Sequence, residues 1–307
     1  MKNVTNILFF ILLSILILIS FWENISSHSI NQPLYEIGRY EPPTFINPVT
    51  KDKILLPLGT DGNRKDYAVV LSSAFRYNLI VSLKGSILFL MTGIFLGLGM
   101  GMIESNSSKS KRFDVILKKF FHYSCNILSE MFQSIPLLII LIISVLFFEL
   151  YIDNPESRFQ YTVYVLALFS SPKLSFQIDG IIKKLKKEEF LLAAKASGIS
   201  KISLIFKHIL YYESKGVILL QFINFFLFTI MIEIFLTYFG KGSTLIQSSI
   251  GSLVFKSSSF LSSINHLLSI GKDQMVLITL VPFIFIIILC ITIRWLGNRI
   301  LILTDTK

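Results

Sequence analysis

Long apolar runs are the feature that most restricts what this chain can fold into. A bilayer core of about 30 Å needs roughly 20 apolar residues in a helix, and several segments of this sequence reach that length with few charges. The chain is 53% hydrophobic and only 16% charged, whereas soluble domains are nearer about 25% charged. These features exclude a soluble globular protein and predict an all-α polytopic membrane protein.

Six segments have the length and apolar character of transmembrane helices. The first follows Lys2 and ends in the aromatic pair Phe21-Trp22. Because this segment lacks a small-x-small cleavage site, we interpret it as a retained anchor and not as a signal peptide. The predicted spans are residues 5–22, 79–103, 127–150, 160–176, 216–239 and 274–296.

The distribution of basic residues predicts the orientation of these spans. With the N-terminus inside the cell, 18 of the 29 Lys and Arg residues lie on the cytoplasmic side, as the positive-inside rule requires. We therefore expect both termini to be cytoplasmic. The expected parts are an anchor at 1–22, an external loop at 23–78 and a transmembrane domain of five helices at 79–300.

Two external segments have polar sequences. Segment 23–78 is polar, contains Pro33, Pro42, Pro43 and Pro48 and predicts an irregular loop. The loop is expected to end in a short surface helix within 61–78, which Thr60 or Asp61 would cap. Segment 248–263 is rich in serine and predicts a solvated, flexible loop.

The cytoplasmic loop 183–215 contains the most informative pattern. Residues 188–197 are good helix formers, and Gly198 then supplies the left-handed position that ends a helix. An apolar stripe at helical spacing follows, formed by Ile202, Ile205, Phe206 and Ile209. The pattern predicts two short helices joined by a glycine turn at the membrane surface, and an amphipathic interfacial linker is the alternative interpretation.

This loop resembles the EAA loop of ABC-importer permeases, whose pattern is E-A-A, three residues, Gly, nine residues and I-x-L-P. Ala193-Ala194, Gly198 and His208-Ile209-Leu210 keep that spacing without a gap. Leu192 replaces the motif Glu and Tyr211 replaces the Pro. Glu189, which lies three residues before Leu192 and near the same helix face, is the candidate substitute.

Four further stretches resemble one branch of that family, the second permease (C-subunit) type of dipeptide, oligopeptide and nickel importers. Leu58–Asp66 is similar to L-G-T-D-x-x-G-R-D, although Arg64 and Lys65 depart from it. Glu130 lies six residues before Pro136, as an Asp does in the family. Residues 233–242 are similar to E-A-S-L-S-F-L-G-L-G, and 297–305 to G-D-G-L-R-D-x-L-D. The chain is identified as a divergent member, and the resemblance runs from about residue 55 to the C-terminus.

The resemblance implies a type-1 ABC importer transmembrane domain in a bacterial cell (inner) membrane. It implies a second permease subunit, two cytoplasmic ATPases, an external binding protein and a peptide substrate. ATPase coupling would fall to residues 188–212, with Glu189, Ala193, Ala194, Gly198 and His208 as the contact residues. The sequence has no G-x-x-x-x-G-K-[ST] motif, so we expect no enzyme activity and no cofactor in this chain, and ATP use in its partners.

Glu130 and Glu233 are the ionisable residues to explain inside predicted spans. A charge at mid-bilayer costs about 2.5–3.5 kcal/mol on insertion scales, so such side chains face protein or water. We interpret both as pathway-lining or interhelical carboxylates. For Glu233 the alternative is a structural pair with a base, Lys84 or Arg76.

Small residues recur on one face of the second predicted span, at Gly93, Gly97 and Gly101. A four-residue spacing of glycines lets two helices approach closely. We therefore predict close helix packing at this face.

Two other classes of protein remain open. A polytopic membrane enzyme would need clustered Asp, His and Arg near a membrane face, and a secondary transporter working alone would usually show inverted repeats. The sequence shows neither pattern. Cys125 and Cys290 lie far apart in apolar surroundings and predict neither a disulfide framework nor a metal site.

Overall fold

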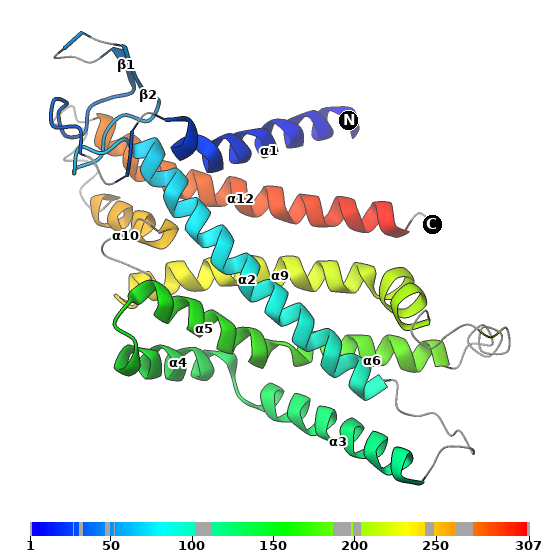
Figure 1. Cartoon of the computed structure of the whole chain (residues 1–307). Helices are drawn as coiled ribbons and strands as arrows, with labels where there is room; N and C mark the ends of the chain where they lie inside the picture. The colour runs from blue at the N-terminus through cyan, green and yellow to red at the C-terminus, as the bar shows by residue number, and fades with distance from the viewer. Residues whose placement is uncertain are drawn as a thin grey trace. The chain divides into compact units, whose positions relative to one another are not determined.

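The computed structural model is mostly helical, with one small hairpin (Figure 1). It describes residues 2–26, 28–30, 33–46, 50–51, 53–101, 112–186, 198, 204–242, 249–261 and 273–305. Three helices within these ranges are long and apolar enough to cross a membrane: α2 (Tyr67–Gly101), α9 (Lys215–Tyr238) and α12 (Asp273–Asp305), the last over Ile278–Ile302. The chain is therefore a membrane protein, as its composition predicts.

The third predicted span is not one straight helix. α3 (Arg112–Ser134) ends just before Pro136, and α4 (Leu137–Tyr151) begins just after it. The two apolar stretches are bent by 86° to each other. Proline has no amide hydrogen to donate and disfavours the helical conformation in the residue before it, so the helix breaks there.

The fourth predicted span is also divided. α5 (Pro155–Ser170) and α6 (Pro172–Lys186) are separate helices, with Ser171 between them. Each helix is shorter than the roughly 20 residues that a bilayer needs. If the bent pair α3–α4 counts as one span, the described residues contain four candidate spans. The expected number of six is not confirmed. The first predicted span is helical, as α1 (Lys2–Ile25), and its role as an anchor stays a prediction.

The chain divides into two compact units, each of which collects segments from distant parts of the sequence. The first unit contains Met1–Val81, Asn154–Phe159 and Thr229–Trp295, and the second contains Ser82–Asp153, Gln160–Phe228 and Leu296–Lys307. Helices α2, α5, α9 and α12 contribute residues to both units.

The first unit corrects two expectations about segment 23–78. The segment is not wholly irregular, because β1 (Thr44–Ile46) pairs antiparallel with β2 (Lys53–Leu56). The expected short surface helix is also not separate: α2 begins at Tyr67 and continues without a break to Gly101. Residues 67–71 are buried, so the start of α2 belongs to the core of this unit.

The first unit also corrects the expectation for the serine-rich segment 248–263. Its described part is a helix, α10 (Ile250–Leu261), and not a flexible loop. Ser249, Ser252 and Ser257 are buried. The Ser249 and Ser252 hydroxyls bond to backbone groups at the start of α10, as serine often does at helix ends. The Ser257 hydroxyl donates to the Ile278 carbonyl of α12. The expectation of a solvated loop was therefore wrong for this part, because serines cap the start of a helix there.

The second unit is held together by close packing of α2 against α6. A Cβ atom added at Gly93, Gly97 or Gly101 would lie 2.9, 2.8 and 2.9 Å from the Cβ atoms of Leu174, Ile178 and Ile182, respectively. These three partners are fully or almost fully buried. The predicted role of the three glycines is confirmed, since only a residue without a side chain permits this approach.

Candidate functional site

Glu233 is a completely buried carboxylate on a helix that is apolar enough to span a membrane. It lies on α9, five residues before the helix ends at Tyr238, and its side chain has no exposed surface. Burying a carboxylate is costly unless hydrogen bonds compensate for the lost water. The surroundings of Glu233 therefore have to supply those bonds.

The main partner of Glu233 is the N-terminus of α10. The Gly251 amide donates a hydrogen bond of 2.7 Å to Glu233 Oε2. One turn along α9, Thr237 Oγ1 donates to Glu233 Oε1 at 3.0 Å. The first amides of a helix have no partner within that helix and carry partial positive charge, so a carboxylate is well placed there. Glu233 thus joins α9 to α10.

Ser249 and Ser252 complete the cap of α10. The Ser252 amide donates to Ser249 Oγ at 3.1 Å, and the Ser249 amide donates to Ser252 Oγ at 2.9 Å. This reciprocal pair has the geometry of a capping box with serine in both places. A Cβ atom at Gly251 would lie 2.5 Å from Glu233 Oε2, so the close approach of the two helices requires glycine at this position.

The two bases that the sequence suggested for Glu233 lie elsewhere in the structure. Arg76 Nη2 forms an ion pair of 2.7 Å with Glu23 Oε2. The Lys84 side chain is exposed. The Asn78 amide instead lies 3.5 Å from Glu233 Oε2. The contacts with Gly251 and Asn78 connect Glu233 on α9 to α10 and α2.

Glu130 has a different environment. It is exposed on α3, and it accepts a hydrogen bond of 3.0 Å from Asn126 one turn earlier on the same helix. This contact lies within one helix, so it joins no two elements. A pathway role for Glu130 stays a prediction.

The loop that resembles L-G-T-D-x-x-G-R-D is folded tightly on itself. Asp61 Oδ1 accepts the amides of Asn63 and Lys65, both at 2.8 Å. Buried Thr60 donates to the Gly38 carbonyl and accepts the Glu41 amide, both at 2.9 Å.

Arg64 has φ of +60° in this loop, at the place where the family pattern has glycine. This left-handed conformation costs an ordinary residue about 1–2 kcal/mol. The loop therefore holds Arg64 in a conformation that glycine would adopt at no cost.

Asp66, not Thr60 or Asp61, caps α2. The Ala68 amide donates to Asp66 Oδ1 at 3.0 Å. Thr60 and Asp61 instead form hydrogen bonds within the loop. Asp66 Oδ2 lies 3.3 Å from His28 Nδ1. Burial raises the pKa of Asp66, and the hydrogen bonds from Ala68 and His28 oppose that rise. Asp66 thus ties the segment after α1 to the start of α2.

The predicted ATPase-coupling residues are only partly described. Glu189, Ala193 and Ala194 lie outside the described residues. Gly198 has φ of +78°, the left-handed conformation expected for it. His208 belongs to η1 (Leu204–Glu213), a π-helical segment in which Ile209 is buried. The contacts of this loop with any partner stay predictions.

Sequence reasoning missed Gly251 and the capping serines. The signal that could have found them is present, because Ser249 precedes an apolar run and a second hydrogen-bonding residue follows at the third helical position. Among the described residues, no three His, Cys, Asp or Glu side chains come together as a metal site would need.

Comparison with known proteins gives a match of fold. No protein-family model matches the chain, and no curated protein sequence matches it. It is similar to a chain of the MetNI methionine ABC transporter in inward-facing conformations (CY5 SeMet soak crystal form), with a TM-score of 0.50 and 14% identity over 76% of this chain and 96% of that chain. The native crystal form of the same transporter gives a TM-score of 0.49 at 14% identity, over 76% and 95% of the two chains.

Proposed function

We propose that this chain is a permease subunit of an ATP-driven ABC importer and forms half of its translocation pathway. The observation that carries the proposal is the fold similarity to a chain of an ABC transporter, which extends over 96% of that chain. The motif resemblances support it independently, because they occur in one order from about residue 55 to the end of the sequence.

In this proposal the loop 188–212 docks onto a partner ATPase. Alanine and glycine leave room for the backbone to approach a groove closely, and the positive φ of Gly198 lets the chain turn at that residue. A helical segment such as η1 transmits a displacement that a flexible loop would absorb. ATP hydrolysis takes place in the partner, and this chain binds no cofactor.

The complete assembly would contain a second permease, two ATPases and an external binding protein in a bacterial cell membrane. The resemblance of the loop 58–66 to the corresponding motif of dipeptide and oligopeptide importers supports a peptide substrate. The excess of basic residues in the segments assigned to the cytoplasm supports internal termini.

Affinity purification from native membranes tests this proposal. The full-length tagged chain should retain a P-loop ATPase and a second polytopic membrane protein in stoichiometric amounts, both identified by mass spectrometry. Deletion of the gene for this chain should also abolish uptake of a labelled tripeptide. Purification of the chain alone, with uptake unchanged, would contradict the assignment.

A pair of variants tests the place of Glu189 in the coupling loop. If Glu189 substitutes for the motif Glu, Glu189→Ala should lower the amount of ATPase that copurifies. Glu188→Ala, one residue earlier and so on another face of the helix that the sequence predicts, should leave that amount unchanged. Equal retention of ATPase by both variants would remove Glu189 from the contact.

A further inference from the structure

Helix α6, in the second unit, has an exposed face on which every side chain is polar. Lys173, Gln177 and Lys184 are exposed, and their spacing of four and seven residues places them on one side of the helix. The other side, which includes Leu174 and Ile178, is buried. α6 is thus an amphipathic helix with its apolar side in the core of the unit.

The apolar helix α4 of the same unit has a different outer face. It exposes large apolar side chains such as Ile142, Ile143 and Leu146, as a helix in contact with lipid does. Among the described side chains of α6, no large apolar one is exposed, since Phe176 and Ile181 are half-buried and pack against apolar clusters. Polar side chains are costly in lipid, so the exposed face of α6 favours contact with water or a polar ligand.

The charges on this face are of one sign and are not neutralised by a neighbour. Within the part of the chain that the structure describes, the ammonium groups of Lys173 and Lys184 have neither an ion pair nor a hydrogen bond. Asp179, the only acidic residue of α6, is buried and pairs with Lys183 at 2.8 Å. The face is therefore complementary to an anion.

Lys173 is too far from the end of α6 to belong to the cytoplasmic cluster of lysines. It lies 11 residues before Lys184, which is about 16 Å along a helix at 1.5 Å per residue. The positive-inside rule concerns basic residues near the ends of spans. A basic residue farther inside a membrane domain usually marks a substrate or ion pathway.

Gln177 lies one helical turn after Lys173 and is fixed by a neighbouring helix. The buried Gln221 of α9 donates from its Nε2 to Gln177 Oε1 at 3.0 Å. Because this bond uses the oxygen of Gln177, the amide nitrogen of Gln177 is available as a donor. An ammonium and an amide donor thus lie one turn apart on the exposed face, close enough for one carboxylate to meet both.

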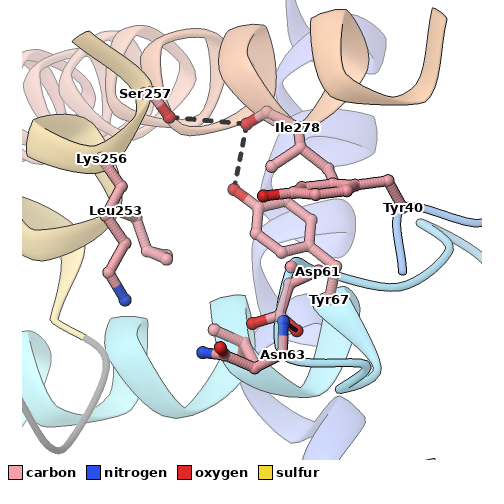
Figure 2. Close-up of a pocket in the computed structure, with 10 residues that line it drawn as sticks. Tyr40, Asp61, Asn63, Tyr67, Leu253, Lys256, Ser257 and Ile278 are labelled. Carbon is pink, nitrogen blue, oxygen red and sulfur yellow. Dashed lines mark hydrogen bonds between the residues drawn. The ribbon is translucent and has the colours of Figure 1, made fainter. Parts of the chain in front are cut away.

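The cavity of about 230 Å³ in the first unit offers no such free donors (Figure 2). Its Tyr67 and Ser257 hydroxyls both donate to the Ile278 carbonyl, at 3.1 and 3.5 Å. Lys256 at its rim has an interaction of its own. The exposed face of α6 is therefore the better candidate for recognition of an anionic group.

We propose that the exposed face of α6 lines the translocation pathway, where Lys173 and Gln177 favour a cargo of net negative charge over a neutral one of the same size. An acidic side chain of the cargo would accept hydrogen bonds from the Lys173 ammonium and the Gln177 amide. This inference rests on the proposed permease function and adds selection by charge to it.

Uptake of two labelled tripeptides by the complete transporter in proteoliposomes tests the selection. Alanyl-glutamyl-alanine and alanyl-glutaminyl-alanine have nearly the same shape and differ by one negative charge. The readout is the ratio of their uptake rates, anionic over neutral. The external binding protein is the same for every variant, so a change in this ratio reports on the permease.

Three variants complete the uptake test. Lys173→Gln should lower the ratio about tenfold, as expected for the loss of one charged hydrogen bond, whereas Lys173→Arg should keep most of it. Lys119→Gln, at an exposed lysine of α3 in the same unit, is the matched control and should keep the ratio of the wild type. Uptake with the same ratio in Lys173→Gln and Lys119→Gln overturns this inference alone. Uptake of neither peptide by the wild type overturns the permease assignment and this inference with it.

Labelling of a cysteine tests the contact with water without any transport. In a chain whose Cys125 and Cys290 are replaced by serine, a charged thiol reagent should modify Gln177→Cys, because the reactive thiolate forms in water. Ile142→Cys, on the exposed apolar face of α4, is the control and should stay unmodified. If Gln177→Cys reacts no faster than Ile142→Cys, the face does not line an aqueous pathway and the proposal is wrong.

Discussion

The interactions inside the first compact unit of this chain differ from those inside the second. In the first unit the long-range contacts include Glu233 at the N-terminus of α10, Asp66 beside His28, and Arg76 paired with Glu23. In the second unit the glycines of α2 pack directly against apolar side chains of α6.

The two sets of interactions differ because different parts of the backbone meet in each unit. The first unit joins irregular segments and helix ends, which leave backbone amides that need acceptors. The second unit joins helix sides, whose backbone groups are already satisfied, so close van der Waals contact is the available interaction. Polar substitutions should therefore damage the first unit, and changes of side-chain size the second.

The largest expected effect is that of Gly97→Leu in the second unit. A Cβ atom there would lie 2.8 Å from Ile178 Cβ and 2.9 Å from the Ser175 carbonyl oxygen. Neither atom is the end of a flexible chain, so the helices must separate. We expect a loss of about 3 kcal/mol of unfolding free energy, measured by thermal unfolding in detergent.

Gly180→Ala on α6 is the control for Gly97→Leu. No neighbouring heavy atom lies within 4 Å of a Cβ at Gly180, so this variant should be as stable as the wild type or more stable by up to about 1 kcal/mol. Equal destabilisation by both variants would remove the packing explanation.

The next largest effect should come from Glu233 in the first unit. Glu233→Ala leaves the buried Gly251 amide without its acceptor, which should cost about 2 kcal/mol. Glu233→Gln keeps an acceptor oxygen and should cost less. Chemical denaturation in detergent measures both.

Glu130→Gln provides the comparison at an exposed carboxylate, and it should change stability by less than about 0.5 kcal/mol. A loss in Glu233→Ala no greater than that in Glu130→Gln would show that the contact with α10 contributes no stability.

The smallest effect is a dependence of stability on pH through Asp66. Its pKa in the folded chain is raised by burial, so the folded state binds this proton more tightly than the unfolded state does. The resulting stabilisation is present below the ordinary carboxyl pKa of about 4 and is lost as pH rises through the raised value. Asp66→Asn should remove this fall in stability with rising pH, measured by thermal unfolding from about pH 4 upward. An unchanged slope in that variant would contradict the assignment to Asp66.

Much of the helical architecture could be predicted from apolar runs, because a run of about 20 apolar residues has few alternatives to a membrane helix. The breaks could not be placed from run length alone. Pro136 and Pro172 lie within or beside apolar runs, and only the structure shows that the chain turns by 86° at the first. The start of α2 was misplaced because Thr60, Asp61 and Asp66 all have capping side chains, and the first two bond within their own loop.

The candidate site was predictable in part. Glu233 was identified because a carboxylate in an apolar run needs a partner. Its actual partner is the Gly251 amide, and the only sequence signal for it is indirect: Ser249 and Ser252 have the spacing of a helix cap and so mark the helix N-terminus in which that amide lies. The two bases considered for Glu233 were chosen by charge, and charge does not reveal that Arg76 lies beside Glu23.

The rate of ATP hydrolysis by the purified complex in nanodiscs tests the central claim, coupling through the loop at Gly198, most directly. Within the described residues a side chain at Gly198 would meet no atom, but its φ of +78° strains any other residue by about 1–2 kcal/mol, and the proposed ATPase groove leaves no room for it. Gly198→Val should therefore abolish peptide-stimulated hydrolysis while the subunit still inserts in the membrane, and Gly180→Ala should hydrolyse ATP as the wild type does. Normal stimulated hydrolysis in Gly198→Val would contradict the account.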